Sequence, residues 1–145
     1  MIGPLDADDI LEIQQLIARI ATTADLAENL DDYLANFTDD VVFDFAPVPA
    51  VGLAAHVYSG LDAVRAGALE RRSAGVQGPG SRTMHVVSDL VVTPSGAETA
   101  EVHVAWQYFG LRDGVPAVLA LGFYRNLVRR VDGRWLLARR EVTVF

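Results

Sequence analysis

Two residues far apart in the sequence, His85 and Asp25, carry the side chains best suited to move a proton. His85 lies in residues 83–92, where β-branched residues predict a half-buried strand. Histidine changes its charge near neutral pH, so an imidazole in such a strand can accept a proton. Asp25 follows Ile17 and Ala21 at four-residue steps along an amphipathic helix. A carboxylate there would accept one ring N–H and leave the other nitrogen for a substrate proton.

Each member of this pair also has a purely structural interpretation. A single strand histidine can be a core residue with satisfied hydrogen bonds, and an aspartate near a helix end can reach solvent. A carboxylate at the edge of an apolar stripe costs free energy unless a donor or cation meets it. Asp25 is therefore predicted to have a partner, and both interpretations of His85 stay open.

The remaining candidate motifs give no metal or cofactor site. His103 alternates with bulky apolar residues and fits a pocket wall or an outer surface, while His56 follows a proline-broken segment and fits a structural or exposed position. The three histidines lack HxH or HExxH spacing, and there are no cysteines. Residues 75–80 are glycine-rich but follow a predicted helix, which does not fit a dinucleotide-binding loop. We therefore expect neither a metal ion nor a cofactor.

Length and charge restrict the class of partner. The 145 residues, 51% of them hydrophobic, predict one globular domain over residues 1–145. A net charge of −7 repels nucleic acids and anionic membranes, so the expected partner is small or uncharged. Residues 1–9 are acidic where a signal peptide would be basic, and no apolar run reaches membrane-spanning length. We therefore expect a cytoplasmic protein.

The predicted elements are helices followed by a run of strands. Apolar residues at three- and four-residue steps predict helices over residues 8–25, 31–37 and 63–72. Runs of β-branched and aromatic residues predict strands over residues 41–45, 56–58, 82–92, 99–110, 116–130 and 134–145. The turns are expected at residues 94–96, 112–114 and 132–133. This order indicates an α+β fold, with helices on one face of a curved antiparallel sheet.

Two further predictions concern the orientation of side chains on one helix and a loop beside the expected pocket. In the helix over residues 63–72, Leu69 is expected to face inward and Arg71 outward. Residues 73–81, which include three glycines, are expected to form a mobile loop that borders the pocket as a lid.

The order of elements resembles the SnoaL-like group of the nuclear-transport-factor-2-like superfamily, which includes scytalone dehydratase. The strings that carry the resemblance are the helix ending at Asp25 and residues 37–42, 58–64, 83–89, 122–124 and 132–135. The resemblance implies a cone of strongly curved antiparallel sheet, closed by helices around one apolar pocket. Its dehydratase-type enzymes use an Asp on the first helix with a strand His, and Asp25 and His85 match these positions. Ala24 and Phe45 stand where scytalone dehydratase has tyrosines, so its substrate is not implied.

These observations lead to two functional hypotheses. The first is a cofactor-independent lyase or isomerase for a hydrophobic cyclic or polyketide-like molecule, with His85 as base and Asp25 as its orienting carboxylate. Its pocket is expected to include Phe43, Phe45, Tyr58, His103, Trp106, Tyr108, Phe123 and Tyr124. The second is a non-catalytic binding or scaffold module, like the small subunits of ring-hydroxylating dioxygenases. Strands that are apolar on both faces, at residues 102–106 and 117–123, predict a homodimer or homotrimer.

Overall fold

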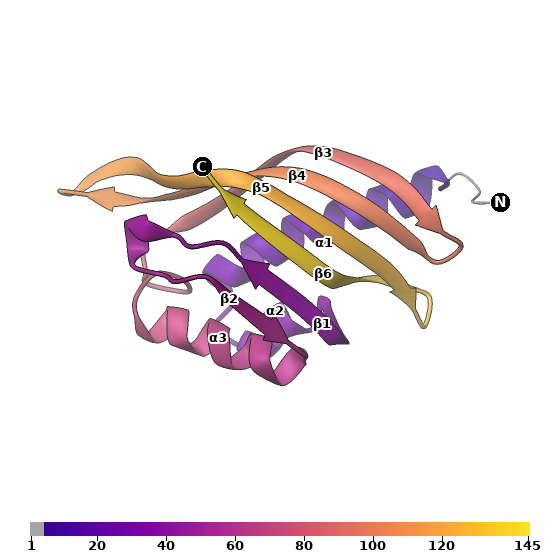
Figure 1. Cartoon of the computed structure of the whole chain (residues 1–145), viewed down its shortest axis with the longest axis horizontal. Helices are drawn as coiled ribbons and strands as arrows, with labels where there is room; N and C mark the ends of the chain where they lie inside the picture. The colour runs from indigo at the N-terminus through magenta and orange to yellow at the C-terminus, as the bar shows by residue number, and fades with distance from the viewer. Residues whose placement is uncertain (1–4) are drawn as a thin grey trace.

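The computed structural model describes residues 5–145, which form three helices, a short 3-10 helix and one six-stranded sheet. The expectation that the chain opens without a signal peptide rests partly on residues 1–4, which lie outside the described residues. In chain order the elements are α1 (Ala7–Leu26), α2 (Leu30–Leu34), β1 (Phe37–Phe45), η1 (Pro49–Val51), β2 (His56–Ser59), α3 (Leu61–Ser73), β3 (Met84–Gly96), β4 (Thr99–Arg112), β5 (Val115–Val131) and β6 (Arg134–Val144) (Figure 1).

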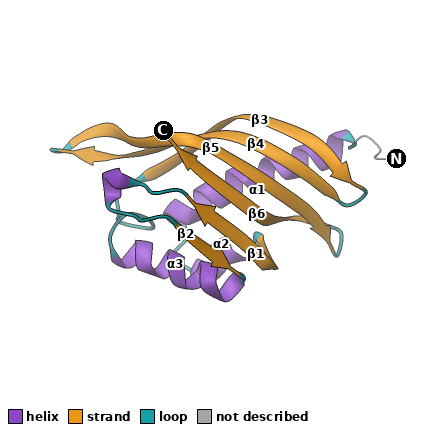
Figure 2. Ribbon diagram, in the orientation of Figure 1, coloured by secondary structure: helices purple, strands orange, loops and turns teal. Residues whose placement is uncertain are grey.

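The sheet has the order β2-β1-β6-β5-β4-β3, and its two edges, β2 and β3, do not pair with each other (Figure 2). The α+β class, the curved sheet and the N-terminal helices are confirmed, but the sheet is not closed. It is also not fully antiparallel, because β1 runs parallel to β6. The sequence could not predict this pairing, since hairpin turns report only strands that are adjacent in the chain.

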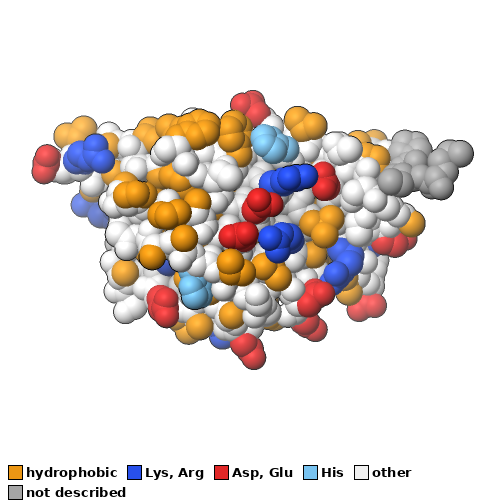
Figure 3. Space-filling model, in the orientation of Figure 1, with side chains coloured by type: hydrophobic (Ala, Val, Ile, Leu, Met, Phe, Trp, Pro, Cys, Tyr) orange, Lys and Arg blue, Asp and Glu red, His pale blue; other side chains and the backbone are white. Residues whose placement is uncertain are grey.

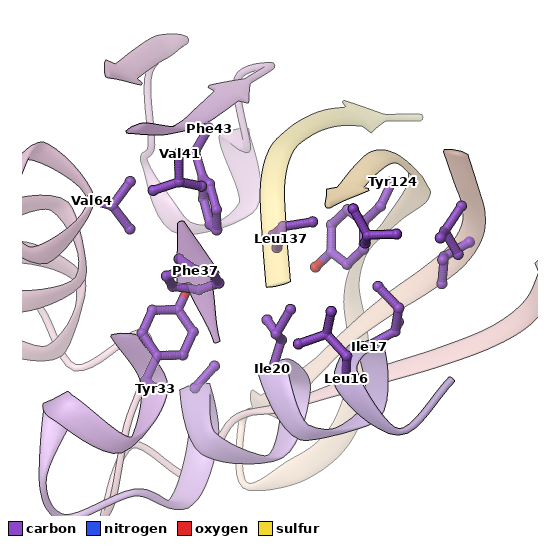
Figure 4. Packing of buried hydrophobic residues seen from close by; sticks show 14 of the residues in the cluster. Leu16, Ile17, Ile20, Tyr33, Phe37, Val41, Phe43, Val64, Tyr124 and Leu137 are labelled. Atoms are coloured by element: carbon purple, nitrogen blue, oxygen red, sulfur yellow. The ribbon is translucent and has the colours of Figure 1, made fainter. Parts of the chain in front are cut away.

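Helix α1 packs its apolar stripe against the sheet. The stripe comprises Ile13, Leu16, Ile17, Ile20 and Ala24. Figure 4 labels Leu16, Ile17 and Ile20. At the start of the helix, the side chain of Asp6 accepts the backbone N–H of Asp9 at 2.8 Å, which caps it. Because Asp25 continues this stripe at helical spacing, its carboxylate is buried between α1 and the sheet.

Helix α3 buries one face that includes a charged residue. Its buried positions are Val64, Gly67, Ala68 and Arg71, at helical spacing, whereas Leu69 is exposed. The predicted orientations of Leu69 and Arg71 are therefore wrong. Gly67 sits so close to the Tyr58 ring that a Cβ atom there would lie 2.5 Å from it. This close approach sets the face of α3 that meets β1 and β2, and it places Arg71 one turn further along the same face.

Strand connections and one bulge shape the sheet. The predicted turns at residues 112–114 and 132–133 are confirmed, the first at residues 113–114. Each has two consecutive positive φ angles, as type I′ turns require. The first turn lies at residues 97–98 rather than 94–96, because β3 continues to Gly96. Within β3, Asp89 has a φ of 55° where the pairing with β4 shifts register. A bulge of this kind bends its strand, which adds to the curvature of the sheet.

None of the helices in residues 5–145 is long and apolar enough to cross a membrane.

Candidate functional site

Asp25 and His85 are in direct contact through two hydrogen bonds. Asp25 Oδ1 lies 2.7 Å from His85 Nδ1, and Asp25 Oδ2 accepts the backbone N–H of His85 at 2.7 Å. The Asp25 side chain is almost fully buried, and 20% of the His85 side chain is exposed. An ionised carboxylate here assigns the ring proton to Nδ1 and leaves Nε2 as an acceptor. The two bonds together fix both the tautomer and the direction of the ring.

His85 lines a cavity between the concave face of the sheet, α1 and α3. The empty space between its wall atoms is about 690 Å³, a figure that includes open solvent at the mouth. Most of its wall is apolar or aromatic and comes from Ile20, Ala21, Ala24, Tyr33, Phe43, Phe45, Val48, Val51, Leu53, Val76, Trp106, Tyr108, Tyr124 and Val142. No described residue bonds to His85 Nε2, so this nitrogen is available to a ligand in the cavity.

Five of the eight predicted pocket residues line this cavity, and three do not. Those inside are Phe43, Phe45, Trp106, Tyr108 and Tyr124. His103 and Phe123 lie on the outer face of the sheet, with ring centroids 5.0 Å apart. Because neighbouring residues of a strand point to opposite faces, Phe123 cannot join Tyr124 inside, and His103 alternates with the inward Val104. Tyr58 on β2 packs behind Phe45 instead, and His56 is exposed beside it.

The glycine-rich loop after α3 forms part of the cavity wall. Its Val76 and Gln77 line the cavity, so the loop borders the pocket. The Tyr108 hydroxyl donates to the backbone carbonyl of Val76 at 2.6 Å, and Arg71 Nε donates to Gln77 Oε1 at 2.6 Å. Burial raises the pKa of Tyr108, which keeps this phenol a donor at neutral pH. The mobility of the loop stays a prediction, and these bonds oppose a wide opening.

The sequence interpretation missed two arginines in the cavity wall. Arg71 is only 8% exposed and Arg140 only 5%. Arg140 Nε donates to Asn126 Oδ1 at 2.8 Å, and the guanidinium carbon lies 4.0 Å from the centroid of the Tyr124 ring. Arg140 lies two residues from the buried Val142, which is a signal that it points inward, but a bulge at Ala138 puts it out of phase with the buried Leu137.

The polar groups near Arg140 do not neutralise its charge. Burial raises the pKa of Tyr124 to about 12, so its phenol stays neutral at neutral pH. Burial lowers the pKa of Arg140 because a charged guanidinium is poorly solvated there. Arginine nevertheless keeps its proton in proteins. The cavity wall therefore carries a buried cation that makes no ion pair with any of residues 5–145.

Within residues 5–145, no group of three or more His, Asp or Glu side chains is placed to hold a metal ion.

Comparison with known families identifies the family to which this chain belongs. The family model of the SnoaL-like domain matches residues 6–141, so the chain belongs to the SnoaL-like family. The resemblance inferred from the sequence is confirmed. No curated protein matches the chain at a significant level.

Solved structures share the fold over nearly the whole chain. A protein of unknown function with a cystatin-like fold from Nostoc punctiforme has a TM-score of 0.78 at 22% identity, over 99% of this chain and 96% of its own. A provisionally named scytalone dehydratase from Novosphingobium aromaticivorans has a TM-score of 0.74 at 19% identity, over 95% and 85%. The beta subunit of a provisionally named aromatic-ring-hydroxylating dioxygenase from the same organism has a TM-score of 0.74 at 16% identity, over 96% and 92%. At these identities the likeness concerns the fold alone.

Proposed function

We propose that this protein is a cofactor-independent lyase or isomerase that removes a proton from a hydrophobic cyclic or polyketide-like small molecule. The observation that carries the proposal is the Asp25 to His85 contact at the wall of an apolar cavity. Asp25 is the orienting carboxylate, and His85 Nε2 is the general base. The family membership and the fold shared with a provisionally named scytalone dehydratase support the same reaction class.

The chemical step begins when His85 Nε2 accepts a proton from a substrate carbon. The electron pair of the broken C–H bond forms a new C=C bond or an enolate. In an elimination, the imidazolium then returns its proton to the departing hydroxyl group, which leaves as water. In an isomerisation, the same proton returns to a different carbon. Asp25 stabilises the transient imidazolium without taking its proton.

A tyrosine can polarise the substrate oxygen during this step. Tyr108 lies beside His85, with ring centroids 5.1 Å apart, but its single proton is donated to Val76. Tyr58 lies outside the cavity. Tyr124 lines the cavity, no described residue hydrogen-bonds to its hydroxyl, and its high pKa keeps it protonated. Tyr33 also lines the cavity, and no described residue hydrogen-bonds to its hydroxyl, so Tyr124 and Tyr33 are both candidates for the oxygen-polarising role.

Solvent exchange tests the proposal without knowledge of the natural substrate. The protein is incubated in D₂O with cyclic ketones that carry acidic C–H groups, such as β-tetralone, and deuterium uptake is followed by mass spectrometry. The wild type should accelerate uptake, and His85→Ala should reduce the protein-dependent rate about 10²- to 10⁴-fold. His103→Ala, on the outer face, is the matched control. Wild-type exchange rates in His85→Ala would contradict the proposal.

The outer face of the sheet favours a second role, as a binding or assembly subunit that forms homodimers or homotrimers. Large apolar side chains are exposed there, among them Phe123 and Leu121. The shared fold with a dioxygenase beta subunit is compatible with this role. Native mass spectrometry distinguishes the two functions, because a tightly retained ligand without proton exchange would favour the binding role.

A further inference from the structure

Two buried guanidinium groups face the cavity without a carboxylate partner. Neither Arg71 nor Arg140 makes an ion pair with any residue in the described part of the chain, and each uses its Nε on a neutral amide, Gln77 or Asn126. Arg140 Nη2 is buried and has no hydrogen-bond partner among the described residues. Most buried polar groups in proteins are hydrogen-bonded, so an orphaned guanidinium N–H on a residue that lines the cavity calls for a partner beyond residues 5–145.

The nearby carboxylates do not supply that partner. Asp25 uses both of its oxygens on His85. Asp44 follows Phe43 on β1 but points to the opposite face, where it meets Arg139 at 3.5 Å. The aromatic rings beside the guanidiniums stack on them, Phe45 on Arg71 at 5.2 Å and Tyr124 on Arg140 at 4.0 Å, without neutralising their charge. The cavity thus has excess positive charge at one part of its wall.

We propose that the pocket binds a ring compound that carries a carboxylate, and that Arg140 and Arg71 hold this carboxylate. Guanidinium groups donate parallel N–H bonds to carboxylates and match their planar geometry. The inference deepens the proposed function, because it names the substrate class of the same cavity and rests on that cavity being a substrate site. A net charge of −7 for the whole chain makes two unpaired internal cations more notable, since acidic partners were available in the sequence.

A row of aromatic side chains in the cavity wall leads from His85 to Arg140. His85 contacts Tyr108, and Trp106 lies two residues from Tyr108 on the same face of β4. Trp106 stacks on Tyr124 with centroids 5.3 Å apart and an interplanar angle of 7°, and Tyr124 carries the Arg140 guanidinium. A flat ring can lie along this wall with its carboxylate at Arg140 and its acidic C–H at His85. The carboxylate and the reacting carbon are therefore on separate parts of the ring system.

Arg71 also marks the route by which such a ligand enters. Phe45, Leu53 and Arg71 line both the inner cavity and a neighbouring hollow that is bordered by His56 and Glu70. A carboxylate that enters from this hollow meets the Arg71 guanidinium at the boundary and Arg140 further inside. Glu70 at the outer rim is repulsive to anions, so the attraction comes from the two inner arginines.

Paired acids and amides test the inference by isothermal titration calorimetry. The probes are benzoate and β-naphthoate, each compared with its neutral carboxamide of the same shape. At least one acid should bind about 10- to 100-fold more tightly than its amide, as expected for charge-assisted hydrogen bonds. Arg140→Met and Arg71→Met should each remove most of this preference and leave amide binding within about twofold. Arg125→Met, an exposed outer-face residue 3.9 Å from Glu101, is the matched control and should keep the preference.

Folding of the variants is checked independently by thermal unfolding. Replacing a buried, unpaired charge by an apolar side chain of similar volume is often neutral or stabilising, so Arg140→Met is expected to fold. If it does not, Arg71→Met on a different element carries the test. Equal binding of every acid and its amide, or no binding of any probe at millimolar concentration, would overturn the inference.

Two further outcomes separate this inference from the proposed function. Acid preference without deuterium exchange supports the carboxylate site and contradicts proton abstraction by His85. Equal acid and amide binding, together with slower exchange in Arg140→Met, would assign the guanidinium to an oxyanion formed during the reaction. That result would overturn the carboxylate assignment and leave the proposed function standing.

Discussion

At Asp25 both carboxylate oxygens bind the same residue, the side chain of His85 and its backbone. The need of Asp25 for a donor could be predicted from the apolar helix stripe, but residue types left the role of His85 open. Its pairing with Asp25 was an expectation from the family resemblance. The backbone bond could not be predicted. It depends on β3 being an edge strand, which leaves the outward N–H of His85 unpaired by the sheet.

Asp25→Asn should separate the orienting role of this carboxylate from simple packing. The amide keeps the shape but turns an NH₂ group toward one of the two donors of His85, so a buried donor loses its acceptor. We expect a loss of about 1–3 kcal/mol in the free energy of unfolding, measured by urea denaturation. Protein-dependent deuterium exchange should fall by less than in His85→Ala, because Nε2 remains present. Wild-type stability and exchange in the Asp25→Asn variant would show that the carboxylate charge is not needed.

The two arginines of the cavity show where reasoning from residue types fails. Charged residues are seldom fully buried, so an arginine on a helix is assigned to solvent unless packing says otherwise. Arg71 faces inward because Gly67 brings that face of α3 close to Tyr58, a contact between distant parts of the chain. Arg140 lies two residues from the apolar Val142 in β6, a signal that the sequence interpretation did not use.

Among the elements, the loop between α3 and β3 is tied to β4 through Tyr108. Tyr108→Phe removes the donor that bonds to the Val76 carbonyl and changes little else in the ring. We expect a loss of about 1 kcal/mol in the free energy of unfolding and faster amide hydrogen exchange in residues 74–83. Tyr124→Phe is the control for loop exchange, because no described residue bonds to that hydroxyl. Unchanged exchange in the loop would show that the hydroxyl does not restrain it.

The start of α1 is tied to the β5–β6 hairpin through Asp9. Its carboxylate accepts Trp135 Nε1–H at 3.0 Å and pairs with Arg130, and these contacts lower the pKa of Asp9, the Trp135 hydrogen bond most strongly. A carboxyl group whose pKa is lower in the folded state stabilises the protein above its unfolded-state pKa. This stabilisation is lost as the pH falls below about 4 and through the folded-state pKa.

Asp9→Asn should therefore destabilise the protein more at neutral pH than in acid. The difference from the wild type in the midpoint of urea unfolding should be smaller near pH 3 than at neutral pH. Asp8→Asn, an exposed neighbour in the same helical turn, controls for the helix dipole. A difference from the wild type that is the same at both pH values would contradict the ionic origin of the effect.

The local elements were more predictable than their assembly. Helix α1 and two hairpin turns follow from periodicity and from Asp-Gly pairs, which adopt positive φ readily. The parallel pairing of β1 with β6 joins the first strand to the last, and no local signal encodes it. This pairing places Phe43 and Phe45 beside the β6 segment that carries Arg140, so the cation site of the cavity exists only in the assembled sheet.

At the scale of the whole molecule, the helices cover only the concave face of the sheet. Figure 3 shows the opposite face, where apolar side chains gather on one side and charged side chains lie near the centre. We define the outer patch as Val118, Leu121, Phe123 and Phe145, whose exposed fractions range from 36% to 81%. Phe123 and Phe145 pack against each other, with ring centroids 5.4 Å apart. Contiguous exposed apolar surface of this kind is typical of subunit interfaces.

Association through the outer patch should make the oligomeric state of the protein in solution depend on Phe123. The wild type should sediment as a dimer or trimer at micromolar concentration, because burying the patch against a second copy removes apolar surface from water. Phe123→Arg places a charge within that contact and should shift the protein toward monomer, with little effect on Tm at low concentration. Leu69→Arg, on the exposed face of α3 and away from the patch, is the matched control. A monomeric wild type at these concentrations would contradict the prediction, and the same shift in both variants would show that the effect does not come from the outer patch.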